Sequence, residues 1–189
     1  MTTIQNNEEP VVVKKRVNSK AKGSGFEGTV AKKLSTIFAP LKFARTPGSG
    51  ARIGGKNFGA IGQFFSDAVK SVFVGDVVPM NENDHGIKFT KVIECKFYRD
   101  PEKLEVILNG KSKIYGWMNE VLIDAEKVEG KTGIVIFKWN NTPIYCAVSA
   151  ETNLPNSINK IIIQQNIQVC HFDELLKFPD FWTVSIPSQ

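Results

Sequence analysis

The chain has 189 residues, 42% of them hydrophobic and 23% charged, which suits one globular domain with a hydrophobic core. It has no apolar run of the about 20 residues that cross a bilayer, and the start MTTIQNNEEP is unlike a signal peptide, so we expect an intracellular protein without a membrane partner. The formal net charge of +5 is concentrated early: residues 28–66 hold six basic residues and no acid. This asymmetry suits a polyanion partner, or otherwise a solvated charged face.

The cysteines and histidines give no sign of a disulfide framework or a zinc site. Cys95, Cys146 and Cys170 are odd in number and show no CxxC spacing. His85 and His171 lie too far apart to show any ligand spacing. We therefore expect the cysteines to be buried, reduced thiols.

The first predicted elements are an arm and a helix. Residues 1–18 are polar and basic without periodicity, which is typical of a flexible arm that contacts DNA. Residues 24–38 have helical spacing, with Ser24 as a plausible N-cap and Pro40 ending the helix. The face of this helix that we expect to be buried comprises Phe26, Val30, Leu34 and Ile37.

A glycine-rich loop and two strands follow. A short strand over residues 41–45 leads into the glycine-rich residues 46–62, which cannot hold regular structure for long. Residues 71–78 and 87–98 are apolar and rich in β-branched side chains, so each is predicted to be a strand. Together these two strands predict a hairpin with a long loop.

The rest of the chain predicts one long helix and further strands. Residues 111–128 are predicted to form an amphipathic helix, whose apolar stripe comprises Ile114, Trp117, Val121, Ala125 and Val128. Residues 133–139 and 143–149 read as two strands, 161–170 as another strand and 172–178 as a short helix before a surface tail. This order of elements predicts an α/β or α+β sandwich around a mixed sheet.

Charged residues interrupt two of these apolar strands. Asp76 lies near the end of the first strand, and Glu94 and Lys96 lie on the second with one residue between them. Alternation along a strand puts Glu94 and Lys96 on one face and Cys95 on the other. The interval between Asp76 and Glu94 leaves room for two adjacent antiparallel strands and a loop. The three ionisable groups can therefore converge at one point of the sheet.

These residue types suit phosphodiester hydrolysis. Charges in an apolar strand are costly unless they are paired or bound to a metal. Mg²⁺ takes oxygen ligands of the kind that Asp76, Glu94 and the backbone carbonyl of Cys95 supply, and it lowers the pKa of an attacking water. The ammonium of Lys96 can orient that water or stabilise the charge on the phosphate. We predict an Mg²⁺ site, with Mn²⁺ as a substitute; the alternative is a partly exposed Glu–Lys pair at a strand end.

The sequence GDVV followed by IECK resembles the PD-(D/E)xK nuclease superfamily. The order of further motifs is similar to that of archaeal-type and phage Holliday junction resolvases: KGSGFEGTVAKKL, RTPGSGA, then GWMNEVLIDAEK and GIVIFKWNNTPIY. The resemblance covers about residues 20–149. It implies an α/β, restriction-endonuclease-like core, in which a central mixed β-sheet is flanked by helices. The corresponding organisation is a flexible basic arm over residues 1–18 and a single nuclease domain over 19–189, with 150–189 as a C-terminal extension.

The resemblance also implies roles for individual residues. Glu27 would join Asp76 and Glu94 at the metal, and Lys96 would be the catalytic lysine. Ser49 would approach the scissile phosphate from the glycine–serine loop. Glu27 could instead be an exposed acid and Ser49 a plain turn serine. The basic residues expected to contact DNA, unless they are simply solvated, are Lys20, Lys22, Arg45, Arg52 and Lys56.

Some positions depart from the family pattern. Gly75 stands where the family usually has proline before the metal aspartate. The long interval before it contains Asp67, an alternative metal aspartate, but we prefer Asp76 because it leads directly into the strand with IECK. Glu120 stands where a glutamine often follows the tryptophan of the helix. Glu120 either tunes the site or is a surface acid, the interpretation we favour.

These features predict an Mg²⁺-dependent endodeoxyribonuclease that hydrolyses branched DNA, above all Holliday junctions, in DNA recombination or repair. The resemblance implies a homodimer, because symmetric resolution needs two nicks from two active sites, and it admits a phage-encoded enzyme that acts in a host cell. One alternative is another PD-(D/E)xK nuclease of the replication, repair or restriction type. The other is a DNA-binding protein with a vestigial site.

Overall fold

The computed structural model describes residues 19–46, 74–163 and 166–185. The predicted N-terminal arm lies outside the described residues, and so do four residues for which a site role was considered: Ser49, Arg52, Lys56 and Asp67.

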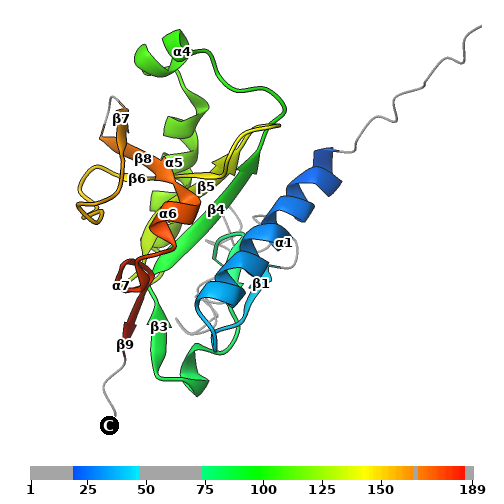
Figure 1. Ribbon diagram of the computed structural model, residues 1–189, viewed down its shortest axis with the longest axis vertical. Helices are drawn as coiled ribbons and strands as arrows, with labels where there is room; N and C mark the ends of the chain where they lie inside the picture. Colours follow the sequence, from blue (N-terminus) through cyan, green and yellow to red (C-terminus); the bar gives the residue numbers. More distant parts are fainter. Residues whose placement is uncertain (1–18, 47–73, 164–165, 186–189) are drawn as a thin grey trace, which may run out of the picture.

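A mixed β-sheet forms the centre of the described part of the chain (Figure 1). Its seven strands follow the order β1-β2-β4-β5-β6-β8-β7. In chain order these strands are β1 (Phe43–Arg45), β2 (Val77–Pro79), β4 (Lys91–Phe97), β5 (Thr132–Lys138), β6 (Tyr145–Ser149), β7 (Ile161–Ile163) and β8 (Ile167–His171). β4 and β5 are parallel, whereas the other neighbours in this sheet are antiparallel. The predicted central mixed sheet is confirmed.

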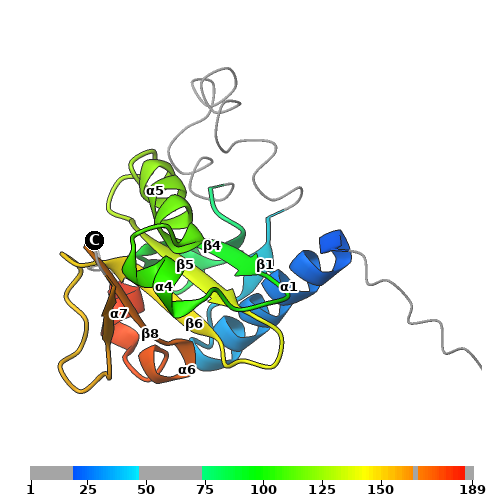
Figure 2. The same ribbon diagram turned by 90° about the horizontal axis from the view of Figure 1, so that it is seen from above.

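Helices cover both faces of this sheet, as predicted. They are α1 (Ser19–Ile37), α4 (Leu104–Leu108), α5 (Lys113–Ala125), α6 (Phe172–Leu175) and α7 (Pro179–Trp182). α1, α6 and α7 pack on the face that holds Ile93 and Cys95, and α5 packs on the face that holds Val92 and Val135. Figure 2 shows the strands between α5 and the layer of α1 and α6. Two cores, one on each face, therefore hold the sheet.

The first helix is longer than predicted. α1 begins at Ser19, so Ser24 lies inside the helix and is not its N-cap. Alanine and lysine residues before Ser24 favour the helical extension. Phe26, Val30 and Leu34 are buried as predicted, but Ile37 is exposed and Phe38 packs into the core in its place.

The predicted strand over residues 87–98 is divided at Thr90. The backbone N–H of Thr90 donates to the carbonyl of Trp182 at 2.8 Å, and its hydroxyl donates to the same oxygen at 3.0 Å. β3 (Ile87–Phe89) therefore pairs with β9 (Thr183–Ser185) in a separate small sheet, while β4 enters the main sheet. The predicted hairpin pairing of β2 with β4 is confirmed, and its loop contains β3 and the 3-10 helix η3 (Glu82–Asp84).

The C-terminal part also differs from the prediction. The single strand predicted over residues 161–170 is two strands, β7 and β8, on either side of Asn166, whose φ is 65°. The predicted surface tail contains α7 and β9, and Trp182 is fully buried, with its indole N–H donating to the carbonyl of Leu175 at 3.0 Å. The tail prediction was wrong because an apolar contact between distant segments has no local sequence pattern.

The predicted long helix and the predicted burial of the cysteines are confirmed. The predicted helix over residues 111–128 is α5, and all the residues of its predicted apolar stripe are buried. The cysteines all lie within the described ranges, where they are buried and free. Among the described helices, none has the length and apolar character needed to span a membrane.

Candidate active site

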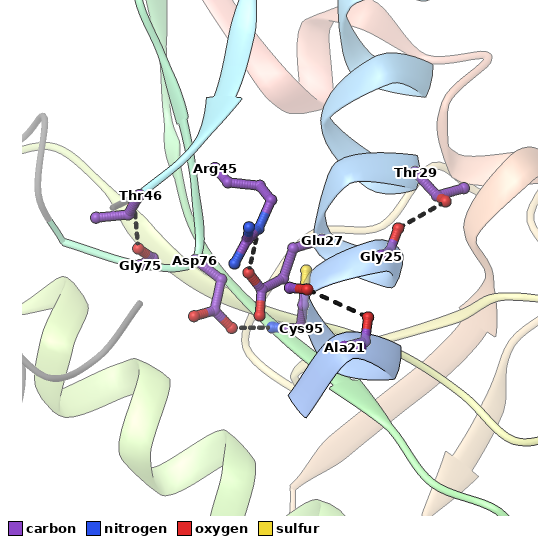
Figure 3. Close-up of polar contacts among 10 residues, drawn as sticks. Ala21, Gly25, Glu27, Thr29, Arg45, Thr46, Gly75, Asp76 and Cys95 are labelled. Carbon is purple, nitrogen blue, oxygen red and sulfur yellow. Dashed lines mark hydrogen bonds and ion pairs between the residues drawn. The ribbon is translucent and has the colours of Figure 1, made fainter. Parts of the chain in front are cut away.

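The candidate site lies where β2 and β4 separate. Among the described residues, β2 and β4 pair at a single position, where Val77 lies opposite Ile93. The N–H of Asp76 donates to the carbonyl of Ile93 at 2.7 Å. Past this point the backbone N–H of Cys95 donates to Oδ2 of Asp76 at 2.8 Å (Figure 3). The side chain of Asp76 thus takes the place of a strand partner along this edge of β4.

A backbone turn at Gly75 directs Asp76 toward β4. Gly75 has a φ of +95°, and a Cβ at this position would lie 2.8 Å from the carbonyl oxygen of Ile93. The hydroxyl of Thr46 donates to the carbonyl of Gly75 at 2.7 Å, and the N–H of Thr46 donates to the carbonyl of Asp76 at 3.0 Å. Proline could not adopt this turn, because its ring holds φ at about −65°. The departure from the family proline therefore has a structural cause.

Substituting Gly75 by alanine is expected to lower the free energy of unfolding by about 1–3 kcal/mol, because a left-handed backbone and a close backbone contact would both become unfavourable. Urea unfolding monitored by circular dichroism measures the change. The matched control is Gly116→Ala on α5, where a Cβ meets nothing within 4 Å, and helix propensity should stabilise that variant by about 1 kcal/mol. Equal stability of Gly75→Ala and wild type would contradict the strained turn.

Glu27 faces the sheet from α1 and is not an exposed acid. Its residue surface is 8% exposed, and its Oε2 accepts a hydrogen bond from Nε of Arg45 at 2.7 Å. Figure 3 shows Glu27, Arg45 and Asp76 pointing toward one another from α1, β1 and the start of β2. The charge of Glu27 contributes to the raised pKa of Asp76. Its role as a metal ligand, and that of Arg45 as a DNA contact, stay predictions.

Glu94 and Lys96 lie on the other face of β4, as alternation predicted. Nζ of Lys96 lies 2.5 Å from Oε1 of Glu94 and 3.5 Å from Oε2 of Glu120 on α5. Burial alone would lower the pKa of Lys96, but Glu94, Glu120 and Asp76 outweigh this effect and raise it. Lys96 is therefore an ammonium at neutral pH, suited to binding negative charge and unsuited to accepting a proton.

The two principal carboxyl groups resist ionisation. Asp76 is 6% exposed, and burial together with the charges of Glu94 and Glu27 raises its pKa to about 7, although the hydrogen bond from Cys95 acts in the opposite direction. Burial also raises the pKa of Glu94, with Lys96 opposing it. Ionising these two carboxyl groups is therefore costly, mainly because they are buried.

Two contributors, Asp124 and Thr46, were not identified from the sequence. Glu120, for which the sequence left a choice between tuning the site and a surface acid, is exposed and contacts Lys96. Asp124 lies on α5 like Glu120, and its charge raises the pKa of Glu94. The spacing of four residues puts Asp124 and Glu120 on one side of α5, and this spacing could have identified Asp124 from the sequence. Thr46, which supports the turn at Gly75, carries no local pattern that points to this role.

The donor chemistry fits a divalent cation bound by two carboxylates. Within residues 19–46, 74–163 and 166–185, no three His, Cys, Asp or Glu side chains are arranged to hold a metal ion. Mg²⁺ needs fewer, since it keeps several waters and commonly uses one or two carboxylates. Burial, followed by the charges of Glu94 and Glu27, raises the pKa of Asp76, and a bound cation would offset this cost of ionisation. Asp76 and Glu94 are the residues that would hold it.

Of the described basic residues predicted to contact DNA, Lys20 and Lys22 lie near the start of α1 and Arg45 lies on β1. Lys20 is exposed. Nζ of Lys22 donates to Oδ1 of Asn140 at 2.8 Å and lies 3.9 Å from the ring centroid of Phe97. These positions are compatible with a DNA contact and do not test it.

Comparison with known families gives a match over most of the chain. The model of a family described as "Phage putative PDDEXK endonuclease" matches residues 18–181. The matched region includes Glu27, Asp76, Glu94 and Lys96. Searches of curated proteins and of solved structures each return no match.

Proposed function

Because the chain belongs to the phage PDDEXK endonuclease family, we propose that it is a metal-dependent DNA endonuclease that cleaves branched DNA, above all four-way junctions. The observation that carries the nuclease proposal is the placement of Asp76, Glu94 and Lys96 at the fork between β2 and β4. Two carboxylates beside an ammonium are the donor set expected for metal-assisted phosphodiester hydrolysis.

We assign the cation as Mg²⁺, with Mn²⁺ as a substitute, held by Asp76 and Glu94 with Glu27 as a third carboxylate nearby. In a strand the N–H and C=O of one residue point to the same edge, so the carbonyl of Cys95 should point to the edge at which its N–H meets Asp76. When bound, the cation would neutralise phosphate charge and lower the pKa of the attacking water.

The chain's own residues bind and orient the phosphate in this proposal. Lys96 presents its ammonium to the charge that develops on the phosphate, and Glu94 and Glu120 hold that ammonium in place. Ser49 would approach the scissile phosphate from the glycine–serine loop. DNA backbone contacts would come from the basic first third, namely Lys20, Lys22, Arg45, Arg52 and Lys56.

The junction as substrate rests on the ordered motifs that resemble Holliday junction resolvases and on the basic first third of the chain. Symmetric resolution needs two nicks in opposite strands, so we propose a homodimer with one active site in each subunit. Sedimentation of the protein alone should then give the mass of a dimer.

The proposal is tested by incubating the protein with a synthetic four-way junction and with linear duplexes of the same sequences. Paired nicks in the junction are expected with Mg²⁺, none with EDTA, and binding without cleavage with Ca²⁺, whose flexible coordination positions water poorly. Equal cutting of all substrates would remove the junction specificity and leave the nuclease. Sequence-specific or end-dependent cutting would favour a restriction-type or replication-type enzyme. Absence of cleavage with Mg²⁺ and Mn²⁺ would favour a DNA-binding protein with a vestigial site.

A further inference from the structure

A cavity of about 700 Å³ lies at the start of β4 and β5, at the other end of β4 from Lys96. Lys91 and Thr132, the first residues of these two strands and aligned in register, form part of its wall. Phe181 of α7 and Ser149 of β6 also line it. Glu27, Asp76, Glu94 and Lys96 do not line this cavity, which has the size of small-molecule sites in proteins, about 300–1,000 Å³.

Lys91 is the notable group in this wall. The residue is 8% exposed, and its Nζ donates to the hydroxyl of Thr132 at 3.0 Å and lies 4.2 Å from the ring centroid of Phe181. All three residues line the cavity. Among the residues that the structure describes, no carboxylate forms an ion pair with Lys91, and burial lowers its pKa to about 8.

The cavity wall holds further cationic and hydroxyl groups beside Lys91, together with carboxylates. Lys131 also lines the wall, and its side chain is 4% exposed. The Nζ of Lys131 forms a long ion pair with Oε2 of Glu82, at 3.9 Å. Hydroxyl donors come from Thr132 and Ser149. Three carboxylates line the same cavity, but they are exposed and thus screened by solvent: Glu126, Glu151 and Asp180.

We propose that this cavity is a binding site for a phosphate group, with Lys91 as its principal contact. A buried ammonium with only neutral contacts gains a charge-assisted hydrogen bond when an oxyanion enters. The phosphate can belong to a free nucleotide or to a DNA strand, since both present the same oxyanion. The inference does not depend on the proposed nuclease activity, because the described residues of the cleavage site, Glu27, Asp76, Glu94 and Lys96, do not line the cavity.

The test is calorimetric titration of the metal-free protein with inorganic phosphate in EDTA, at constant ionic strength. Wild type and Asp76→Asn should bind phosphate equally, and Lys91→Met should bind it about tenfold more weakly or worse. The matched control is Lys111→Met, which removes an exposed lysine elsewhere and should leave binding unchanged. Absence of saturable binding to wild type, or equal binding by Lys91→Met, would overturn the site.

A measurement on the wild-type chain avoids any folding defect of the variant. Phosphate should protect Lys91, and not Lys111, from acetylation by an amine reagent, as read by peptide mass spectrometry. Tighter protection by a nucleoside monophosphate than by a single-stranded oligonucleotide would assign the phosphate to a free nucleotide, and the reverse order would assign it to DNA. Equal protection by a nucleoside without phosphate would exclude recognition of the phosphate.

Discussion

Lys96→Met is expected to slow DNA cleavage by roughly 10²–10³-fold, the usual effect of removing one group that stabilises transition-state charge. Lys96 lies within 2.5 Å of Glu94 and 3.5 Å of Glu120, and these acids raise its pKa, so the protein at neutral pH loses a full positive charge in the variant. DNA affinity should change little, because one phosphate contact among many is lost. Single-turnover cleavage under saturating enzyme measures the rate apart from binding.

Two variants separate this effect from a general loss of positive charge. Lys160→Met removes an exposed lysine beside β7, at the far side of the sheet, and should cleave at the wild-type rate. Glu120→Gln keeps Lys96 but removes an exposed partner, so a loss of about tenfold or less is expected. A Lys96→Met enzyme that cleaves as fast as wild type would refute the catalytic assignment of Lys96.

The elements that the sequence predicted well are those whose burial imposes a pattern. α5 carries its apolar stripe on one face, and β5 is an uninterrupted buried run, so helical or strand periodicity is visible locally. The same alternation placed Glu94 and Lys96 on one face of β4 and Cys95 on the other. Periodicity could identify the strand and its faces without knowledge of the neighbours.

The errors arise where distant segments decide the local structure. Thr90 ends β3 because its backbone and hydroxyl bond to Trp182, far along the chain, and no pattern around Thr90 announces that contact. Gly75 was recognised as a departure from the family proline, but its left-handed turn is explained by the nearness of Ile93. The contact between Glu120 and Lys96 likewise depends on how α5 crosses β4.

Asp76→Asn is expected to abolish cleavage and at the same time to stabilise the metal-free protein at alkaline pH. The pKa of Asp76 is about 7 in the folded protein, whereas an unperturbed aspartate has a pKa of 3.8. Between these values the folded state binds the proton that the unfolded state has lost, so the free energy of unfolding falls as pH rises through this interval. Asparagine keeps an oxygen that can accept the bond from Cys95 but carries no charge, and it removes this dependence.

At about pH 8 the gain in unfolding free energy is expected to be on the order of 2 kcal/mol, less than the full pKa difference implies because Asp76 and Glu94 titrate together. Urea unfolding in EDTA at about pH 5 and about pH 8 measures it, with the exposed Glu126→Gln as a control that should behave as wild type. Identical pH dependence of Asp76→Asn and wild type would contradict a buried, strained carboxylate.

Added Mg²⁺ should reverse the order of stability at alkaline pH. A cation that binds the folded wild type stabilises it by mass action, whereas Asp76→Asn has lost one of the two carboxylates proposed to hold the ion. The metal-free wild type should thus be less stable than the variant, and the Mg²⁺-bound wild type more stable. A structural buried aspartate would show the first difference alone, so the reversal on adding Mg²⁺ distinguishes a metal ligand from an acid that is merely buried.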